Sequence, residues 1–222
     1  MDQHKEHHNK HEFQDEMKDH LDDAAKTFQE VTHPGKFDIT KEFKNAFGVI
    51  KLNATKMHTV SESKSASLGA FLFILITIIA INFGNYLVYF RFGLARAAYS
   101  NLIITALITL ASLIISIFVY DFIGSYLFKG KKSFRELFRV MGYGYLIMIV
   151  SLVPVLMLVG SIWYLIITYK SLINVKKLNP TNAVITMLLT IVAVAIIFFV
   201  ISLIIGGDSL YYYGFNSYGL PL

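Results

Sequence analysis

The feature that most constrains this chain is a body of long apolar runs, from about residue 65 to residue 205, that carries very few charges. A helix needs about 20 apolar residues to cross the hydrocarbon core of a bilayer, and several runs reach that length. A composition of 55% hydrophobic and 16% charged residues is unusual for a soluble domain. All seven histidines lie at or before His58, and the acidic residues beyond Glu62 are Asp121, Glu136 and Asp208. The sequence therefore predicts an all-α, integral membrane protein behind a polar N-terminal segment.

Three runs are clear predictions of membrane spans. They extend from Ser67 to Phe90, from about Asn101 to Tyr120, and from about Ala183 to Ile205. The stretch from Val140 to Val175 is too long for one span and tight for two. Because Pro154 lacks a backbone donor and clashes with the turn before it, we expect a hairpin there, joining two spans of roughly 17 residues each. One span kinked at the proline is the alternative.

The basic residues predict how the spans are oriented. Cytoplasmic loops collect Lys and Arg, and short loops weigh most. With five transmembrane helices, a cytoplasmic N-terminus and an outside C-terminus, Arg91 and Arg96 are the only basic residues that lie outside. With four spans, the loop holding Lys176 and Lys177 would also lie outside. The five-span arrangement is therefore the better prediction.

A short basic stretch before the third predicted span is a candidate site. Ser133 and Glu136 fit the S-x-x-E capping box, so a helix should begin there. The simplest interpretation of the cations around it is a cytoplasmic anchor with no ligand, and the alternative is a site for a lipid headgroup or an acidic protein partner. The candidate residues are Lys129, Lys131, Lys132, Arg135 and Arg139, together with Lys176 and Lys177 of the next short loop.

Two longer stretches, GKKSFRELFRVMGYGYLIMIVSLVP (130–154) and SIWYLIITYKSLINVKKLNPTNAVITMLL (161–189), carry a resemblance to a known family. Their order and spacing resemble the Yip-domain family of five-span membrane proteins, named for interaction with Ypt/Rab GTPases, over roughly Leu68 to Ile205. The matching features are a fourth span with Trp163, an alanine-led fifth span, and the helix-packing residues Gly142, Tyr143, Gly144, Tyr145 and Pro154.

The resemblance implies a bundle of five helices, a cytosolic head and no known enzymatic chemistry. Eukaryotic members are associated with small GTPases and with traffic between endoplasmic reticulum and Golgi. Their Asp-Leu-Tyr-Gly-Pro motif ahead of the first span is missing here, where residues 65–70 read SASLGA. That absence favours a prokaryotic member in the cell membrane, with the endoplasmic reticulum or Golgi membrane as the alternative. A cysteine-rich zinc ribbon at the head, common in prokaryotic members, is excluded because the chain has no cysteine.

The head, residues 1–64, has two amphipathic patterns of opposite sign. An acidic helix is predicted over about 12–31, with an apolar stripe suited to a partner helix or to loose packing on the bundle. A basic helix is predicted over about 39–51, either lying in the membrane interface or buried against the bundle. The remaining segments are a His-rich tail at the N-terminus and a polar linker over Lys56 to Ser67. The apolar stripe of the acidic helix comprises Phe13, Met17, Leu21, Ala24, Phe28 and Val31.

Signals of catalysis are weak. His4, His8, His11 and Asp15 would share a helix face suited to a transition metal, but order is not expected at an extreme terminus. The predicted spans carry no ionisable group near their middles, where transporters and intramembrane enzymes place them. We therefore expect no enzyme, no cofactor, no metal site and no nucleic-acid partner. The pI of 9.2 is attributed to membrane anchors.

The sequence thus favours a non-enzymatic, multi-pass membrane protein that organises protein partners or lipids through its cytoplasmic face. The alternative is a passive permease or lipid-transporting bundle that uses Asn82, Asn85 and the glycines of its spans. Self-association is left open. The aromatic tail, residues 206–222, is predicted to form a belt at the far interface.

Overall fold

The protein is helical throughout the part of the chain that the structure describes. This structure is a computed structural model, and it describes residues 3–34, 37–91, 102–131 and 133–205. The predicted aromatic tail lies outside these residues. The α-helices are α1 (Gln3–Thr32), α2 (Ile39–Ile50), α3 (Ala54–Glu62), α4 (Ala66–Arg91), α6 (Leu102–Tyr126), α7 (Phe134–Tyr145), α8 (Met157–Asn174) and α9 (Pro180–Ile205), with short 3₁₀ helices η1 (Leu146–Leu152) and η2 (Pro154–Leu156) between α7 and α8.

Four of the described helices are long and apolar enough to cross a membrane. They are the stretches Ala66–Leu87, Leu102–Tyr126, Met157–Asn174 and Pro180–Ile201. The first, second, fourth and last predicted spans are therefore confirmed as span-length helices. The second continues six residues beyond its predicted end at Tyr120 and so includes Asp121.

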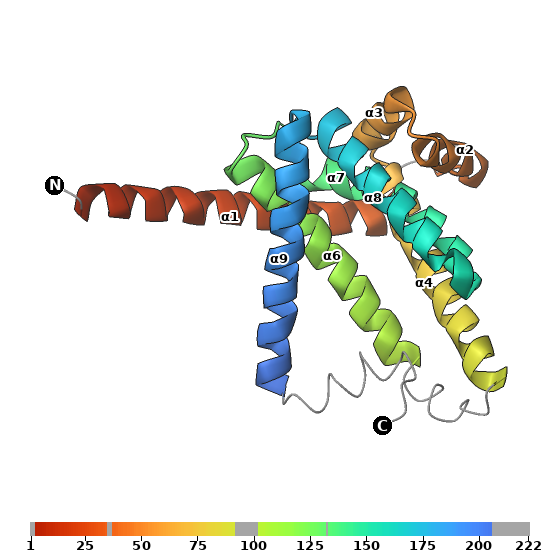
Figure 1. The fold of residues 1–222 in the computed structure, drawn as a ribbon. Coiled ribbons are helices and arrows are strands. Elements are labelled where there is room, and N and C mark those ends of the chain that lie inside the picture. The colour runs from red at the N-terminus through yellow and green to blue at the C-terminus, as the bar shows by residue number, and fades with distance from the viewer. Residues whose placement is uncertain (1–2, 35–36, 92–101, 132, 206–222) are drawn as a thin grey trace.

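The third predicted span is not one continuous α-helix. The α-helical part, α7, ends at Tyr145 after 12 residues, and the chain continues as η1 for seven more. The expected reversal near Pro154 is present, because η1 and α8 run back along one another (Figure 1). A single kinked helix is therefore wrong. At the close approach of the two legs, a Cβ on Gly160 would lie 2.9 Å from Val150 Cγ2.

The head contains both predicted amphipathic helices and a third that was not predicted. Asp38 caps α2 by accepting from the amides of Thr40 and Lys41 at 2.9 and 3.2 Å. The segment interpreted as a polar linker includes α3, which Asn53 caps through the amide of Lys56 at 3.0 Å. The linker prediction is wrong there because a single Asn cap and two inward side chains, Met57 and Val60, make so polar a sequence helical.

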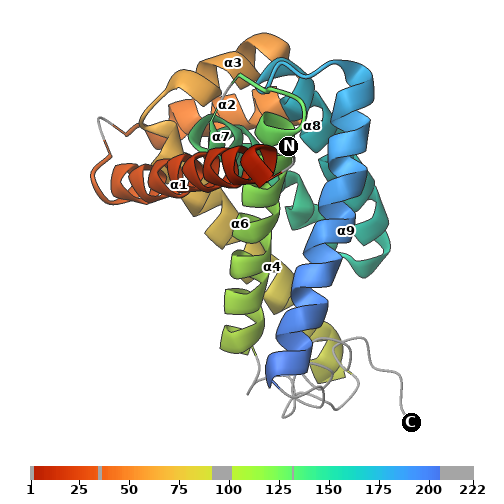
Figure 2. The same cartoon turned by 90° about the vertical axis from the view of Figure 1, so that its left-hand side faces the viewer.

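The head, the loop between α6 and α7 and the loop between α8 and α9 gather at one end of the bundle, called the head end below (Figures 1 and 2). Helices α4, α6 and α9 extend away from this end, while α1 runs crosswise to them and packs against α4, α6 and α7 (Figure 1). The loop before α7 meets the loop before α9, where Lys131 N donates to Lys176 O at 3.1 Å. One hydrophobic core joins head residues such as Val49 and Met57 to Phe73 and Phe138 of the bundle.

Candidate functional site at the junction of head and bundle

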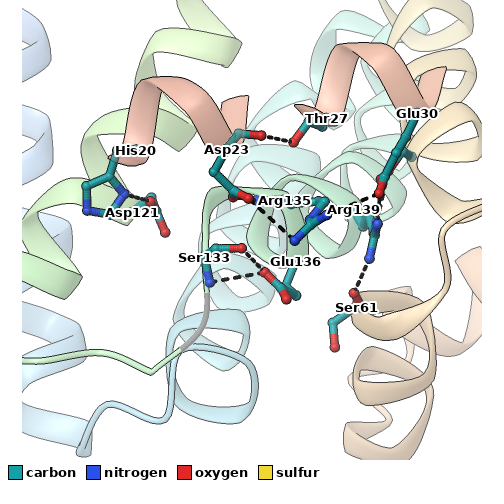
Figure 3. Close-up of polar contacts among 11 residues, drawn as sticks. His20, Asp23, Thr27, Glu30, Ser61, Asp121, Ser133, Arg135, Glu136 and Arg139 are labelled. Carbon is teal, nitrogen blue, oxygen red and sulfur yellow. Dashed lines mark hydrogen bonds and ion pairs between the residues drawn. The ribbon is translucent and has the colours of Figure 1, made fainter. Parts of the chain in front are cut away.

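Helix α1 meets the bundle through a polar strip. His20, Asp23, Thr27 and Glu30 recur at steps of three and four, so they share one helix face. Thr27 is fully buried and its hydroxyl donates to Asp23 O at 2.8 Å. Figure 3 shows the other three reaching toward α6 and α7. The predicted apolar stripe lies beside this strip, and its Leu21 remains 55% exposed.

Two arginines of α7 bind two carboxylates of α1. We call Arg135, Arg139, Asp23 and Glu30 the arginine junction (Figure 3). Glu30 accepts from Arg139 Nη2 at 2.5 Å and forms an ion pair with Arg135 Nη1 at 3.3 Å. Asp23 accepts from the backbone amide of Arg135 at 3.0 Å, at the N-terminal turn of α7 where orphan amides favour an anion. The junction therefore ties α1 to α7 across more than one hundred residues of sequence.

Arg139 is almost fully buried, with 4% of its side chain exposed. Besides Glu30, it donates from Nε to Ser67 Oγ at 2.9 Å and from Nη1 to Ser61 O at 2.6 Å. The Ser67 hydroxyl donates in turn to Glu30 at 2.7 Å. Every guanidinium nitrogen of Arg139 is therefore hydrogen-bonded, as a buried charge requires, and the partners come from α1, α3 and α4.

These contacts set the charge state of Glu30. Burial of its carboxyl acts to raise the pKa. The hydrogen bonds from Ser67 and Arg139 and the positive charges of Arg139 and Arg135 outweigh burial, so the pKa of Glu30 lies below its ordinary value. The carboxylate form is thus the one that the junction holds.

A second group, the Asp121 cluster, lies further along α1. Asp121 Oδ1 pairs with Lys176 Nζ at 2.5 Å and Oδ2 with His20 Nδ1 at 2.5 Å. Lys176 also donates to Ser125 Oγ at 2.5 Å, and both Asp121 and Lys176 are fully buried. The aliphatic part of the Lys176 side chain packs closely against the loop before α7, where a Cβ added to Gly130 would lie 3.3 Å from Lys176 Cδ.

A third polar group lies where α2 meets α7. Glu42, 1% exposed, accepts from Tyr143 OH at 2.7 Å and from Asn45 Nδ2 at 2.9 Å. Ser65 Oγ donates to its other oxygen at 3.2 Å. The three groups together give α1 and α2 fixed positions on the bundle.

The predicted packing residues lie at close helix contacts. Gly142 faces α4, where an added Cβ would lie 2.7 Å from Ala70 Cβ, and Gly144 faces α8, where it would lie 2.5 Å from Ile167 Cγ2. Tyr145 stacks edge-on against Tyr164 of α8, with ring centroids 5.3 Å apart. Pro154 begins η2, and its side chain lies outside the described residues.

The predicted basic site is divided in two by the structure. Arg135, Arg139 and Lys176 bind carboxylates of this same chain, which the sequence did not indicate. Lys129, Lys131 and Lys177 are exposed at the head end. Lys132 lies outside the described residues. The prediction that these cations meet a partner or a headgroup remains a prediction.

Ser133 is the N-cap of α7, as predicted, and its amide donates to Glu136 at 3.0 Å in a capping box. The side chains of His4, His7, His8 and His11 lie outside the described part of the chain. Among the described residues, no group of three metal-ligating side chains comes together. Asn82 and Asn85 were the residues named for the alternative function as a permease. Asn82 donates to Ile78 O of its own helix at 2.8 Å, and Asn85 is exposed.

Sequence comparison agrees with the predicted family. The model of the Yip1 domain matches residues 47–203, from the second half of α2 nearly to the end of α9. No curated protein and no solved structure matched the chain. The match covers more than half of the chain, and it accords with an all-helical bundle that has several span-length helices. The chain is an integral multi-pass membrane protein that belongs to the Yip1 domain family.

Proposed function

We propose that this Yip1-domain protein organises protein partners at the membrane surface and carries out no enzymatic reaction. The observation that carries the proposal is the head-bundle junction, where three polar groups fix α1 and α2 on the bundle. A fixed head presents a constant surface, whereas a loosely attached head would not. Yip1-domain proteins are generally non-enzymatic, in keeping with this role.

The proposed binding surface is the exposed remainder of the basic site. Arg135, Arg139 and Lys176 are bound to carboxylates of the chain itself, whereas Lys131 and Lys177 are exposed, so a partner would meet Lys131 and Lys177. Exposed cations of this kind steer an acidic partner and set specificity more than they add affinity. On α1, Asp15, Asp19 and Asp22 are exposed and offer the opposite charge nearby.

The proposed orientation places the head end in the cytoplasm and the C-terminus outside. The support is that both described inter-span loops with lysines lie at the head end and are bonded to one another. The C-terminus lies on the side opposite the head in either case, whether the α7–α8 hairpin crosses the bilayer twice or enters and returns on the same side. We propose the cell membrane of a prokaryote as the location, because the motif of the eukaryotic members is missing.

The test uses the absence of cysteine. A single cysteine replacing Thr181, exposed at the start of α9, places a crosslinker beside the lysines of both loops. We expect one recurrent protein partner in intact cells and its loss in the Lys131→Glu/Lys177→Glu variant. The matched control, Lys51→Glu/Lys64→Glu, reverses two exposed lysines of the head and should retain it. Capture that survives reversal of the loop lysines would contradict the proposed surface.

A further inference from the structure

The hairpin formed by α7, η1, η2 and α8 is shorter than the neighbouring spans. In both views its tip ends well before the ends of α4, α6 and α9 that are remote from the head (Figures 1 and 2). The 18 residues of α8 extend about 27 Å, whereas the 26 residues of α4 or α9 extend about 39 Å. The hydrocarbon core is about 30 Å thick. In Figure 1 α8 is also inclined to α9, so its extent along the direction of α9 is shorter than its own length.

The tip of the hairpin has the composition of a segment surrounded by hydrocarbon. Residues 152–159 read LVPVLMLV, without a charge, a hydroxyl or an amide side chain. Val155 is 84% exposed and Leu158 is 73% exposed. Such side chains are more stable in an apolar environment than in water. Lipid tails are therefore the neighbours that suit this tip.

The backbone of the tip can also lie in hydrocarbon. A turn exposed to lipid needs its amides bonded internally, because no water is available there. Val153 N donates to Val150 O at 3.1 Å, and Leu156 N donates to Val153 O at 2.8 Å. Pro154, between them, has no amide proton. The turn thus meets this requirement at these three positions.

The basic helix α2 adds apolar surface at the head end. Ile39 and Phe47 are 47% and 57% exposed on a helix whose Lys41 and Lys44 are also exposed, a pattern typical of helices that lie in the interface. Trp163 of α8 holds α2 beside the hairpin by donating from Nε1 to Ile50 O at 2.9 Å. The head-side half of the molecule therefore contains three spans, the hairpin and α2, whereas the described far half contains the three spans alone.

We infer that the hairpin enters only the head-side half of the bilayer, and that the protein is a wedge that favours curved membrane with its head on the convex face. Material inserted into one leaflet expands that leaflet relative to the other, so the bilayer bends away from it. Binding of interfacial helices depends on curvature for the same reason. This activity goes beyond the proposed organising role, and it depends neither on the partner nor on which compartment faces the head.

The first arm of the test measures the depth of the tip. Single cysteines at Val155, Lys177 and Leu203 carry nitroxide labels in the full chain, reconstituted in phosphatidylcholine bilayers. We expect the Val155 label to be reached by oxygen and not by a water-soluble nickel chelate, while the labels at Lys177 and Leu203 are reached by the chelate. Contact of the Val155 label with the chelate to the extent seen at Leu203 would overturn the half-depth hairpin.

The second arm measures the response to curvature. The full chain, with a fluorophore attached to the cysteine of Lys177→Cys, is reconstituted in giant vesicles. A thin membrane tube is then pulled from each vesicle. With heads outside, we expect a higher protein density on the tube than on the parent vesicle, and with heads inside a lower one. Replacing apolar surface of α2, in Ile39→Ala/Phe47→Ala, should reduce the enrichment. The matched control Leu188→Ala/Leu203→Ala, exposed on α9, should not. Equal density on tube and vesicle in both orientations would overturn the wedge.

Discussion

The two polar groups beneath α1 hold the same helix but differ in their access to water. In the Asp121 cluster the side chains of Asp121 and Lys176 are fully buried. In the arginine junction, Glu30 and Arg135 are 17% and 30% exposed. A fully buried pair is costly to break, since the charge left behind has no solvent. A partly hydrated junction loses less when one partner is removed. The comparison indicates that the Asp121 cluster fixes the loops between spans, while the arginine junction determines whether α1 stays in place.

The largest expected effect comes from the buried pair. Lys176→Met leaves Asp121 with His20 as its partner in a fully buried position, and we expect a loss of about 3–5 kcal/mol in the free energy of unfolding. Denaturant titration in mixed micelles measures it. Lys177→Met, at the exposed neighbouring position, serves as the control. The double variant Asp121→Asn/Lys176→Met should regain much of the loss. Equal stability of Lys176→Met and Lys177→Met would contradict the account of this cluster.

A smaller effect is expected at the junction. Glu30→Gln keeps the shape of the side chain but removes the charge that Arg139 and Arg135 share. We expect a loss of about 1.5–3 kcal/mol, the usual contribution of hydrogen bonds to charged groups. Hydrogen exchange should quicken in the amides of α1 near Glu30 and stay unchanged in α6. Asp22→Asn removes an exposed carboxylate of the same helix and is the control; equal acceleration in both variants would count against the junction.

Acid should release α1 through the same group. The pKa of Glu30 is lowered in the folded state, so the carboxylate stabilises docking fully above the ordinary glutamate pKa. That stability is lost as the pH falls through the lower, folded-state pKa, where Glu30 takes up a proton. We expect the protection of the α1 amides, measured against their intrinsic exchange rate at each pH, to fall at acidic pH in the unaltered protein, and to fall less steeply in Glu30→Gln. Identical pH profiles in the two proteins would rule out Glu30 as the titrating group.

The smallest effect concerns the start of α7, which positions both arginines. Ser133→Ala removes the N-cap hydroxyl and should cost about 1 kcal/mol. The same titration measures it, with Thr181→Ala at the exposed start of α9 as the comparison. A change no larger than that of Thr181→Ala would show that the cap is dispensable.

Local signals allowed part of this structure to be predicted. The span-length helices follow from continuous apolar runs, and α1 and α2 follow from apolar residues at helical spacing. The Ser133–Glu136 cap is a pattern of four residues. In each case the determinants lie within one element of the chain.

Contacts distant in sequence were not predicted. Glu30 and Arg139 are separated by more than one hundred residues, and nothing near either residue indicates the other. The predicted second span stopped at Tyr120 and so left Asp121 out, and its partner Lys176 was interpreted as an anchor. The apolar stripe of α1 indicated a docking face, but the ion pairs of the neighbouring strip decide how the helix lies. Burial and pairing of charges depend on tertiary structure, which periodicity does not encode.

The most direct test of the account is whether α1 is held at one position on the bundle. Nitroxide labels on cysteines replacing Lys26 of α1 and Thr181 of α9, both exposed, give the distribution of distances between the two helices by pulsed electron spin resonance. The account predicts one narrow distribution in the unaltered background, which broadens when Asp23→Asn and Glu30→Gln are added together. A broad distribution before these changes, or a narrow one that survives them, would contradict the claim that the polar strip of α1 fixes the head.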